Sequence, residues 1–428
     1  MHTISQVRLN NLDVVERIEE IFMDGDYDSI RQAVAKYFIP TAEERHGAAE
    51  VPTPPSLVDE MLSKIPEEFW KTPNTVLEPC CGKGNFVLAV FQKFDNGLKY
   101  MFPDTTTRHR CIVEDCIHFT DISALNVMIT RELLRCASGG VAKLYNSRQG
   151  DTLHMKWDEP FGAVVGNPPY NSNGTLGTGN TIWQKFTTSA LTSWTTDNGY
   201  VCFVHPPMWR KPESARSKSQ GLFKLMAHDN HMEYLEMHDI KDGMKVFGAG
   251  TRYDWYVIHR GAQGLTEIDG VEYDLKNFKF LPNSGVQELT PLLGSGCGVM
   301  YSRTWYGADK SHVSTEQGGE FVYPLIHSTP KGGVRYRYSI MNDKGFFGVP
   351  KVIFGDSGIY DPVVDLEGQY GMTQHSMAIP VDGPEDAQQL VEFLTSEKFK
   401  SILNSCMWSN FQIDWSLFTY FRPGFWRV

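Results

Sequence analysis

The chain carries a short apolar run that ends in a polar tetrapeptide: Phe161-Gly162-Ala163-Val164-Val165-Gly166-Asn167-Pro168-Pro169-Tyr170. An uninterrupted apolar run of this length predicts a buried strand of a parallel sheet. The tetrapeptide then lies just beyond the carboxyl end of the strand, where ligands bind in open α/β sheets. Taken alone, the two prolines also suit a turn that merely ends the strand.

Strands and helices alternate on both sides of this run. Apolar patterns predict strands at 76–78, 116–121, 199–205, 232–237 and 253–259, and helices at 85–94, 124–134 and 183–194. Such alternation indicates βαβ units and a mostly parallel sheet, so we expect the α/β fold class.

A chain of 428 residues exceeds the roughly 250–300 residues that one hydrophobic core supports, so we expect two domains. Residues 1–45 carry a helical pattern and form a lead-in, and residues 46–261 hold the alternating strands and helices. From 262 to 428 glycine, proline and aromatic residues are frequent and the strands look short and irregular, before a helical pattern returns at 387–404.

The composition is that of an ordinary globular protein, with 41% hydrophobic and 21% charged residues. No run approaches the ~18 apolar residues of a membrane span, and the start of the chain lacks an apolar signal core. We therefore expect a cytoplasmic protein that is neither secreted nor membrane-bound. The net charge of -11 argues only mildly against nucleic acid, because phosphates are contacted by a local patch.

The eight cysteines show no spacing typical of a metal site. Cys80 and Cys81 are adjacent, and Cys111 and Cys116 are badly spaced for zinc. We expect free, buried thiols and no metal.

A glycine turn follows the strand at 76–78: Leu77-Glu78-Pro79-Cys80-Cys81-Gly82-Lys83-Gly84-Asn85-Phe86. The glycines let the backbone approach a ligand, and the helix start offers free N–H groups. A third glycine, usual in dinucleotide-binding loops, is absent. The Glu78 carboxylate repels phosphate but suits the ammonium of an amino acid.

Further acids and acceptors follow at strand ends and in loops. Asp121 ends the next strand, where acids accept the hydroxyls of a ribose. Asp151 precedes the tetrapeptide and can accept from an adenine amino group, although alone it looks like any loop aspartate. The Asn167 amide oxygen and a neighbouring carbonyl can accept both hydrogens of one amino group, and Tyr170 offers a flat face to a base.

Taken together, Glu78-Pro79-x-x-Gly82-x-Gly84-x-Phe86 and Asn167-Pro168-Pro169-Tyr170 resemble the S-adenosylmethionine-dependent amino-methyltransferases, specifically the gamma-class adenine-N6 DNA methyltransferases. The resemblance covers roughly residues 46–260. It implies a Rossmann-like domain with a mostly parallel seven-stranded sheet, followed by a mixed α+β target-recognition domain. A weaker piece is Thr53-Pro54, although Val51-Pro52 stands where the family commonly has an aromatic residue.

The resemblance also implies roles for individual residues. The cofactor S-adenosylmethionine would be bound by Thr53, Glu78, Pro79, Gly82, Gly84, Phe86, Asp121, Asp151 and Asn167. The catalytic residues would be Asn167, Pro168, Pro169 and Tyr170, which hold a flipped-out adenine while its amino group receives the methyl. The polar loop 171–180 would close over the base, or is an ordinary surface loop.

The expected partner is double-stranded DNA. Two patches suit phosphate contact, stacking or groove entry: Arg210 and Lys211, followed by Arg216 and Lys218, and then Lys331, Arg335, Tyr336 and Arg337. A solvated sheet edge would look similar to the second patch. The resemblance also allows a cognate restriction endonuclease on a separate chain.

Other readings of the same core stay open at this stage. They are a methyltransferase acting on protein glutamine, on RNA adenine or on cytosine N4, and a non-catalytic nucleic-acid-binding module. The roughly 165-residue tail favours nucleic acid, because reading a sequence needs a surface of its own.

Overall fold

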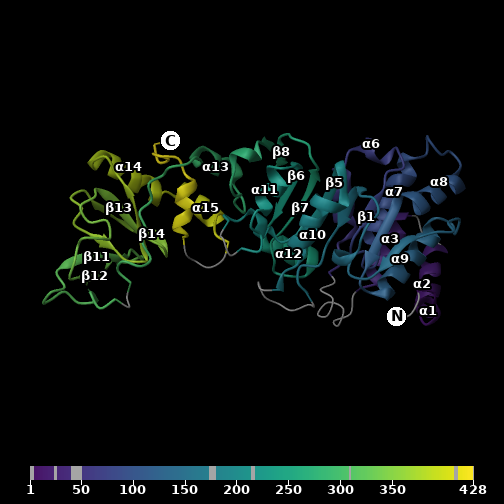
Figure 1. Cartoon of the computed structure of the whole chain (residues 1–428), viewed down its shortest axis with the longest axis horizontal. Helices are drawn as coiled ribbons and strands as arrows, with labels where there is room; N and C mark the ends of the chain where they lie inside the picture. Colours follow the sequence, from purple (N-terminus) through teal and green to yellow (C-terminus); the bar gives the residue numbers. More distant parts are fainter. Residues whose placement is uncertain are drawn as a thin grey trace. The chain divides into compact units, whose positions relative to one another are not determined.

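The computed structural model (Figure 1) describes residues 4–23, 27–39, 51–172, 180–213, 217–307, 310–408 and 413–427. The chain forms two compact units. The first unit comprises Met1–Trp209 and Glu213–Asn277, and the second unit comprises Arg210–Pro212 and Phe278–Val428. Within the described ranges no helix is long and apolar enough to cross a membrane.

Among the described residues of the first unit, nine strands form one sheet in the order β3-β2-β1-β4-β5-β7-β6-β8-β9. Neighbours are parallel except at β7, which runs against β5 and β6, and at the β8–β9 hairpin. The prediction of a mostly parallel sheet is confirmed. The strands are β1 (Val76–Glu78), β2 (Ile117–Asp121), β3 (Asn146–Gln149), β4 (Phe161–Gly166), β5 (Thr195–His205), β6 (His231–His238), β7 (Tyr253–His259), β8 (Thr266–Ile268) and β9 (Val271–Tyr273).

The prediction of seven strands is wrong, because β8 and β9 extend the edge beyond β6. Each of these strands has only three residues, too few to show an alternating apolar pattern. They follow Gly261, where we expected the second domain to begin. The first unit instead continues to Asn277.

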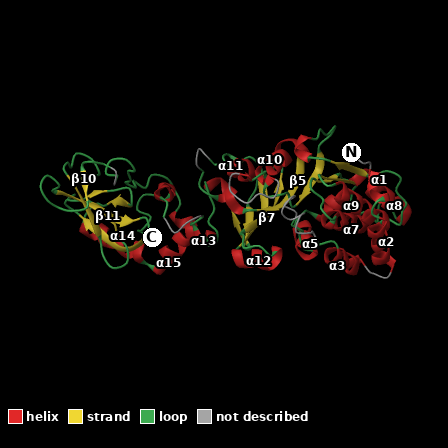
Figure 2. Ribbon diagram, turned by 90° about the horizontal axis from the view of Figure 1, so that it is seen from below, coloured by secondary structure: helices red, strands yellow, loops and turns green. Residues whose placement is uncertain are grey.

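Helices cover both faces of the sheet. On one face, α5 (Pro55–Ser63), α7 (Asn85–Gly97) and α9 (Ala124–Ala137) share an apolar cluster with alternate residues of β4, β5 and β7. Figure 2 shows α10 (Trp183–Ser189) and α11 (Leu222–Ala227) on the side of β5 and β7 opposite α5 and α12 (Ile240–Phe247). Because both faces are covered, central strands such as β4 are apolar along their length.

Three short helices at the start of the chain pack on this unit through α7 and α9. They are α1 (Ile4–Leu9), α2 (Leu12–Met23) and α3 (Tyr27–Tyr37). Val15, Ile18 and Val34 form an apolar cluster with Leu88 and Met128. Among the described residues, the further α-helices of the unit are α6 (Glu67–Trp70) and α8 (Thr105–Cys111).

In the second unit the described strands form a four-stranded sheet, β10-β12-β11-β15, and a three-stranded sheet, β14-β13-β16. Aromatic rings from the end of the chain, including Phe418, Phe421 and Phe425, pack against α14 and α15. The elements are α13 (Val286–Leu289), β10 (Val313–Ser314), β11 (Tyr323–Ser328), β12 (Arg335–Ser339), β13 (Lys351–Gly355), β14 (Gly358–Asp365), β15 (Gly371–Met372), β16 (Ser376–Pro380), α14 (Pro384–Thr395) and α15 (Glu397–Ser405).

Candidate functional site

A cavity of about 1010 Å³ opens at the carboxyl ends of β1, β2 and β4. All four residues of the tetrapeptide line it, together with eight of the nine residues expected to bind the cofactor: Thr53, Glu78, Pro79, Gly82, Phe86, Asp121, Asp151 and Asn167. Gly84 instead precedes α7 with a φ of 83°, and a Cβ there would lie 3.1 Å from Thr130 Oγ1. The fold thus gathers residues that are far apart in the sequence.

The carboxylate of Asp121 fixes the glycine turn. Its Oδ2 accepts from the amide of Gly82 at 2.9 Å, and its Oδ1 accepts from the amide of Ser123 at 2.8 Å. The side-chain amide of Asn126 donates to the same Oδ1 at 3.2 Å. A carboxylate has about four acceptor positions, so one remains for a ligand hydroxyl. Asp121 is therefore a structural residue of the turn as well as a lining residue of the cavity.

Glu78 is a second acid that lines the same cavity. Its side chain is buried, and its Oε2 has no hydrogen-bond partner among the described residues. Burial raises the pKa of Glu78 well above its ordinary value, the charge of Asp121 raises it further, and the Val87 amide lowers it. Burial also raises the pKa of Asp121. Two crowded acids disfavour a phosphate and favour a cationic ligand.

The side chain of Asn167 has a defined orientation. Its Nδ2 donates to the carbonyl of Val51 at 3.2 Å and to Thr53 Oγ1 at 3.1 Å. A carbonyl can only accept, so the amide nitrogen must face Val51 and the amide oxygen must face the other way. Asn167 Oδ1 is buried and has no partner among the described residues. The free acceptor is thus aimed by the two bonds on the other end of the same amide.

Gly166, immediately before Asn167, separates the tetrapeptide from the acid of β1. It has a φ of 149°, a conformation that other residues rarely adopt. A Cβ at this position would lie 3.5 Å from Glu78 Cγ and 3.9 Å from Glu78 Oε1. Gly166 therefore brings the start of the tetrapeptide next to the acid of the glycine-turn motif.

The rest of the tetrapeptide shapes the wall of the cavity. Pro168 is buried, and the Tyr170 hydroxyl is buried without a partner in the described structure. Burial raises the pKa of Tyr170, so the phenol stays neutral. The Tyr170 carbonyl accepts from Ile182 N at 3.0 Å, which closes the base of the following loop. Residues 173–179 of the proposed closing loop lie outside the described residues.

Asp151 lines the cavity and begins a short 3-10 turn, Thr152–His154. Its Oδ1 accepts from the amide of Leu153 at 3.0 Å. The side chain is 45% exposed, and its Oδ2 lies 3.6 Å from Nε2 of the exposed His154.

Sequence patterns missed three residues of this site. Lys83 donates to Asn126 Oδ1 at 2.6 Å and its charge lowers the pKa of Asp121. Ile122 lines the cavity with 63% of its surface exposed, unusual for a large apolar side chain. The sequence signal for Ile122 was its position directly after Asp121, the acid that ends β2. Nothing in the sequence pattern marks Asn126, because it acts through contacts made only in the fold.

The expected role of Arg210 in DNA contact is contradicted by its burial, with 1% of its surface exposed. Its guanidinium donates to the carbonyl of Pro282 and lies 4.9 Å from the centre of the Trp408 ring. Arg210 therefore supports the core of the second unit. Arg216, its neighbour in the expected patch, lies outside the described residues, and Lys218 lines the cavity of the first unit.

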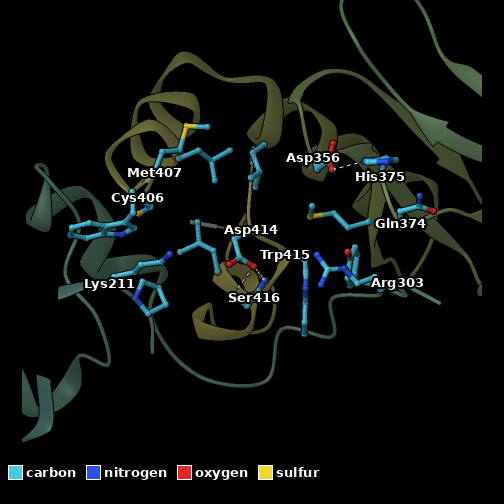
Figure 3. A pocket seen from close by; sticks show the side chains of 17 residues that line it. Lys211, Arg303, Asp356, Gln374, His375, Cys406, Met407, Asp414, Trp415 and Ser416 are labelled. Atoms are coloured by element: carbon cyan, nitrogen blue, oxygen red, sulfur yellow. Dashed lines mark hydrogen bonds and ion pairs between the residues drawn. The ribbon is translucent and has the colours of Figure 1, made fainter. Parts of the chain in front are cut away.

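Lys211 lines a separate cavity of about 610 Å³ within the second unit (Figure 3). The rings of Tyr301 and Trp415 stack on its wall with centroids 5.1 Å apart. On the side of the pocket away from Lys211, His375 Nδ1 lies 3.1 Å from Asp356 Oδ2. Lys211 thus faces a walled pocket with mixed charge, which does not suit a continuous track of phosphates.

The remaining expected nucleic-acid residues lie on one hairpin. Lys331 is in the turn between β11 and β12, next to Gly332 and Gly333, whose φ values are 103° and 123°. Arg335 and Tyr336 are exposed, whereas Arg337 is half-buried and its Nη1 donates to the Tyr336 carbonyl at 3.2 Å. The two strands are the central pair of the four-stranded sheet, and their connecting turn carries Lys331.

The sequence matches no protein-family profile and no curated protein. Solved structures with similar folds include a modification subunit of a putative type I restriction enzyme from Vibrio vulnificus, at 14% identity and a TM-score of 0.41 over 60% of this chain and 55% of that one. Another is a putative class I S-adenosylmethionine-dependent methyltransferase from Listeria monocytogenes, at 15% identity and a TM-score of 0.38 over 60% and 77%. The restriction-modification enzyme MmeI in complex with DNA aligns at 10% identity and a TM-score of 0.44 over 92% and 70%. The chain spans about half the length of the first of these structures.

These likenesses have low identity and low TM-scores, so we argue function from the residues of the cavity.

Proposed function

We propose that the protein is an S-adenosylmethionine-dependent methyltransferase that methylates the N6 amino group of adenine in DNA. The observation that carries this proposal is the Asn167 amide, whose oxygen is a free acceptor in the same cavity as Glu78 and Asp121. The Asn167 oxygen would bind the amino group of the target, and the acids Glu78 and Asp121 would bind the cationic cofactor beside it.

The cavity residues fit the cofactor. S-adenosylmethionine supplies an electrophilic methyl group on a sulfonium centre, and its amino-acid part carries an ammonium. The unpartnered Oε2 of Glu78 offers an acceptor to that ammonium. The free acceptor position of Asp121 suits a ribose hydroxyl, Asp151 suits the adenine amino group, and Ile122 supplies an apolar face.

The tetrapeptide fits the target. The lone pair of an aromatic amino group is delocalised into its ring, which makes the nitrogen a poor nucleophile. Asn167 Oδ1 and the Pro168 carbonyl would accept the two amino hydrogens, favouring a pyramidal nitrogen and stabilising the charge that develops on it. Tyr170 would stack on the extruded base. An amide is not a useful base, so the proton would leave to solvent after transfer.

The hairpin of the second unit supports DNA as the polymer. It presents Lys331 and Arg335 beside the exposed ring of Tyr336, a combination that suits phosphate contact and groove entry. Transfer to protein glutamine, RNA adenine or cytosine N4 uses the same acceptor geometry, so the product must be identified directly.

The experiment uses S-adenosylmethionine with a labelled methyl group. The protein is incubated separately with unmethylated genomic DNA, RNA and a protein extract, and each product is digested and identified. We expect N6-methyladenine in DNA; methyl-glutamine without any modified base would overturn the proposal. The variant Asn167→Ala should lose methyl transfer but still bind the cofactor, whereas Asn96→Ala, on the exposed side of α7, should retain both. Turnover by purified Asn167→Ala would also overturn the assignment.

A further inference from the structure

Three potential metal ligands meet on the sheet of the first unit, away from the cavity: His231, Glu233 and His259. His259 Nδ1 lies 3.1 Å from Glu233 Oε1, and His231 Nδ1 lies 3.8 Å from the same oxygen. All three ligand atoms lie within 4.8 Å of one another. We propose that this cluster binds a divalent transition-metal ion, and that Zn²⁺ is the ion that fits it best.

The strand pairing explains how residues so distant in the sequence meet. β6 and β7 are antiparallel neighbours, with β8 beside β6 (Figure 1), and His231 is paired directly with His259. The register shifts between Met232 and Tyr234, so Glu233 is the extra residue of a bulge. Bulges redirect side chains out of the normal alternation. Here the bulge places the carboxylate beside both imidazoles.

Contacts outside the cluster hold each ring in position. His231 Nε2 lies 2.8 Å from the carbonyl of Leu265, which can only accept. Nε2 therefore donates to this carbonyl, and Nδ1 is the ring nitrogen on the side of the cluster. A Cβ on Gly264 would lie 2.4 Å from the His231 ring, so this loop closes tightly over it. The ring of Tyr200 stacks on His259 with centroids 4.7 Å apart.

A backbone carbonyl that orients a histidine is the usual outer partner of a metal-bound imidazole. Tetrahedral zinc with bonds of about 2.0–2.1 Å needs ligand atoms roughly 3.3 Å apart, and the distances of 3.1 and 3.8 Å bracket that value. The three side chains are 17%, 27% and 23% exposed, so an ion and a water ligand can enter. Two imidazoles and one carboxylate suit zinc better than magnesium or calcium.

The position of the cluster predicts a structural role. His231 begins β6 and His259 ends the antiparallel β7, so the ion would lie toward the amino ends of the parallel strands. The cofactor cavity opens at their carboxyl ends. A bound ion would fasten the β6–β7 pair and the loop that leads through Leu265 to β8. This inference does not depend on the proposed methyltransferase activity.

The test uses untagged full-length protein, freed of metal with a chelator. Zinc is titrated by calorimetry, and cobalt is titrated while its visible absorption is recorded. We expect a single site, a higher thermal midpoint with zinc, and four-coordinate cobalt bands without thiolate charge transfer. His231→Gln, Glu233→Gln and His259→Gln should each weaken zinc binding by about tenfold or more. His312→Gln, in the second unit, is the matched control.

Glu233→Gln is the most informative variant, because it keeps the size of the side chain and removes one charged ligand. It should lose zinc binding and the zinc-dependent gain in thermal midpoint while keeping the metal-free fold and the methyl transfer rate. Absence of saturable zinc binding would overturn the proposal. Binding that is equal in all four variants, or a thiolate charge-transfer band that places the ion on cysteines, would overturn it as well.

Discussion

Thr53 holds Asn167 by its side chain: the Asn167 amide Nδ2 donates to Thr53 Oγ1 over 3.1 Å. Thr53 is buried, and its own carbonyl accepts from Asn85 Nδ2 at 2.8 Å, which ties it to the start of α7. The segment before the glycine turn thus positions the Asn167 amide, which we propose to bind the target. Thr53 was expected to contact the cofactor, and the structure adds this second connection.

The first prediction concerns Thr53→Val, which keeps the shape of the side chain and removes the acceptor. Asn167 loses one of the two bonds that orient it, so kcat should fall by about tenfold to a hundredfold. The Kd for the cofactor, measured by calorimetry, should change little. Thr53→Ser, which keeps the hydroxyl, should restore kcat; an equally slow serine variant would contradict a positioning role.

The second prediction concerns Glu78→Gln. Removing the charge should weaken cofactor binding by about tenfold to a hundredfold, because a charge-assisted hydrogen bond is lost. The same variant should unfold at a higher temperature at neutral pH. Calorimetric titration with the cofactor and thermal melts of the ligand-free protein measure the two effects separately.

The sign of the stability effect follows from the raised pKa of Glu78. The folded protein holds this proton to a higher pH than the unfolded chain does. The free energy of unfolding therefore falls as pH rises from the unfolded pKa through the folded pKa. The gain from Glu78→Gln should be present at about pH 8 and shrink toward about pH 4. A variant that melts below the wild type at both pH values would contradict this account.

The third prediction concerns the β11–β12 hairpin. Lys331→Ala combined with Arg335→Ala should weaken DNA binding and lower the slope of log Kd against log salt by about one to two. Lys398→Ala, an exposed cation on α15, is the control for charge removed elsewhere on the unit. An unchanged salt slope in the double variant would remove the hairpin from the DNA-binding surface.

The fourth prediction concerns a buried ion pair in the second unit. Lys351 Nζ lies 2.6 Å from Asp365 Oδ2, and both side chains are almost fully buried. Lys351→Met leaves the carboxylate without its cation and should lower the free energy of unfolding by about 3–5 kcal/mol. Adding Asp365→Asn should recover part of that loss, because the amide oxygen can still accept from the backbone. Chemical denaturation of the wild type and both variants measures their free energies of unfolding, which should rank wild type highest, the double variant next and Lys351→Met lowest.

Some strands were predictable because most of their residues are apolar. β4 and β7 have the bounds that the sequence predicts, since both are covered on two faces. β3 was missed because Asn146–Gln149 is a polar edge strand with no apolar pattern. The order of motifs along the chain also indicated which residues would gather at the carboxyl ends of β1, β2 and β4.

Other features depend on contacts that no local pattern encodes. Arg210 looks like an available cation in the sequence, and only the fold shows Trp408 and Pro282 around it. The orientation of Asn167 depends on Val51, which is far away in the chain. Glu233 faces two histidines only because of a strand bulge. Propensity and periodicity report burial and secondary structure, but contacts between segments far apart in the sequence decide these three cases.

Gly166 has a consequence for how such a site can change over time. Gly166 directly precedes the tetrapeptide, and a Cβ on it would lie 3.5 Å from Glu78 Cγ. A Cβ at Gly166 would meet Glu78 only at ordinary contact distance, but the residue's φ of 149° is one that other residues rarely adopt, so a substitution there would strain the backbone directly before Asn167. Under the proposed function, we therefore expect Gly166 to stay fixed while the choice of target changes through the second unit.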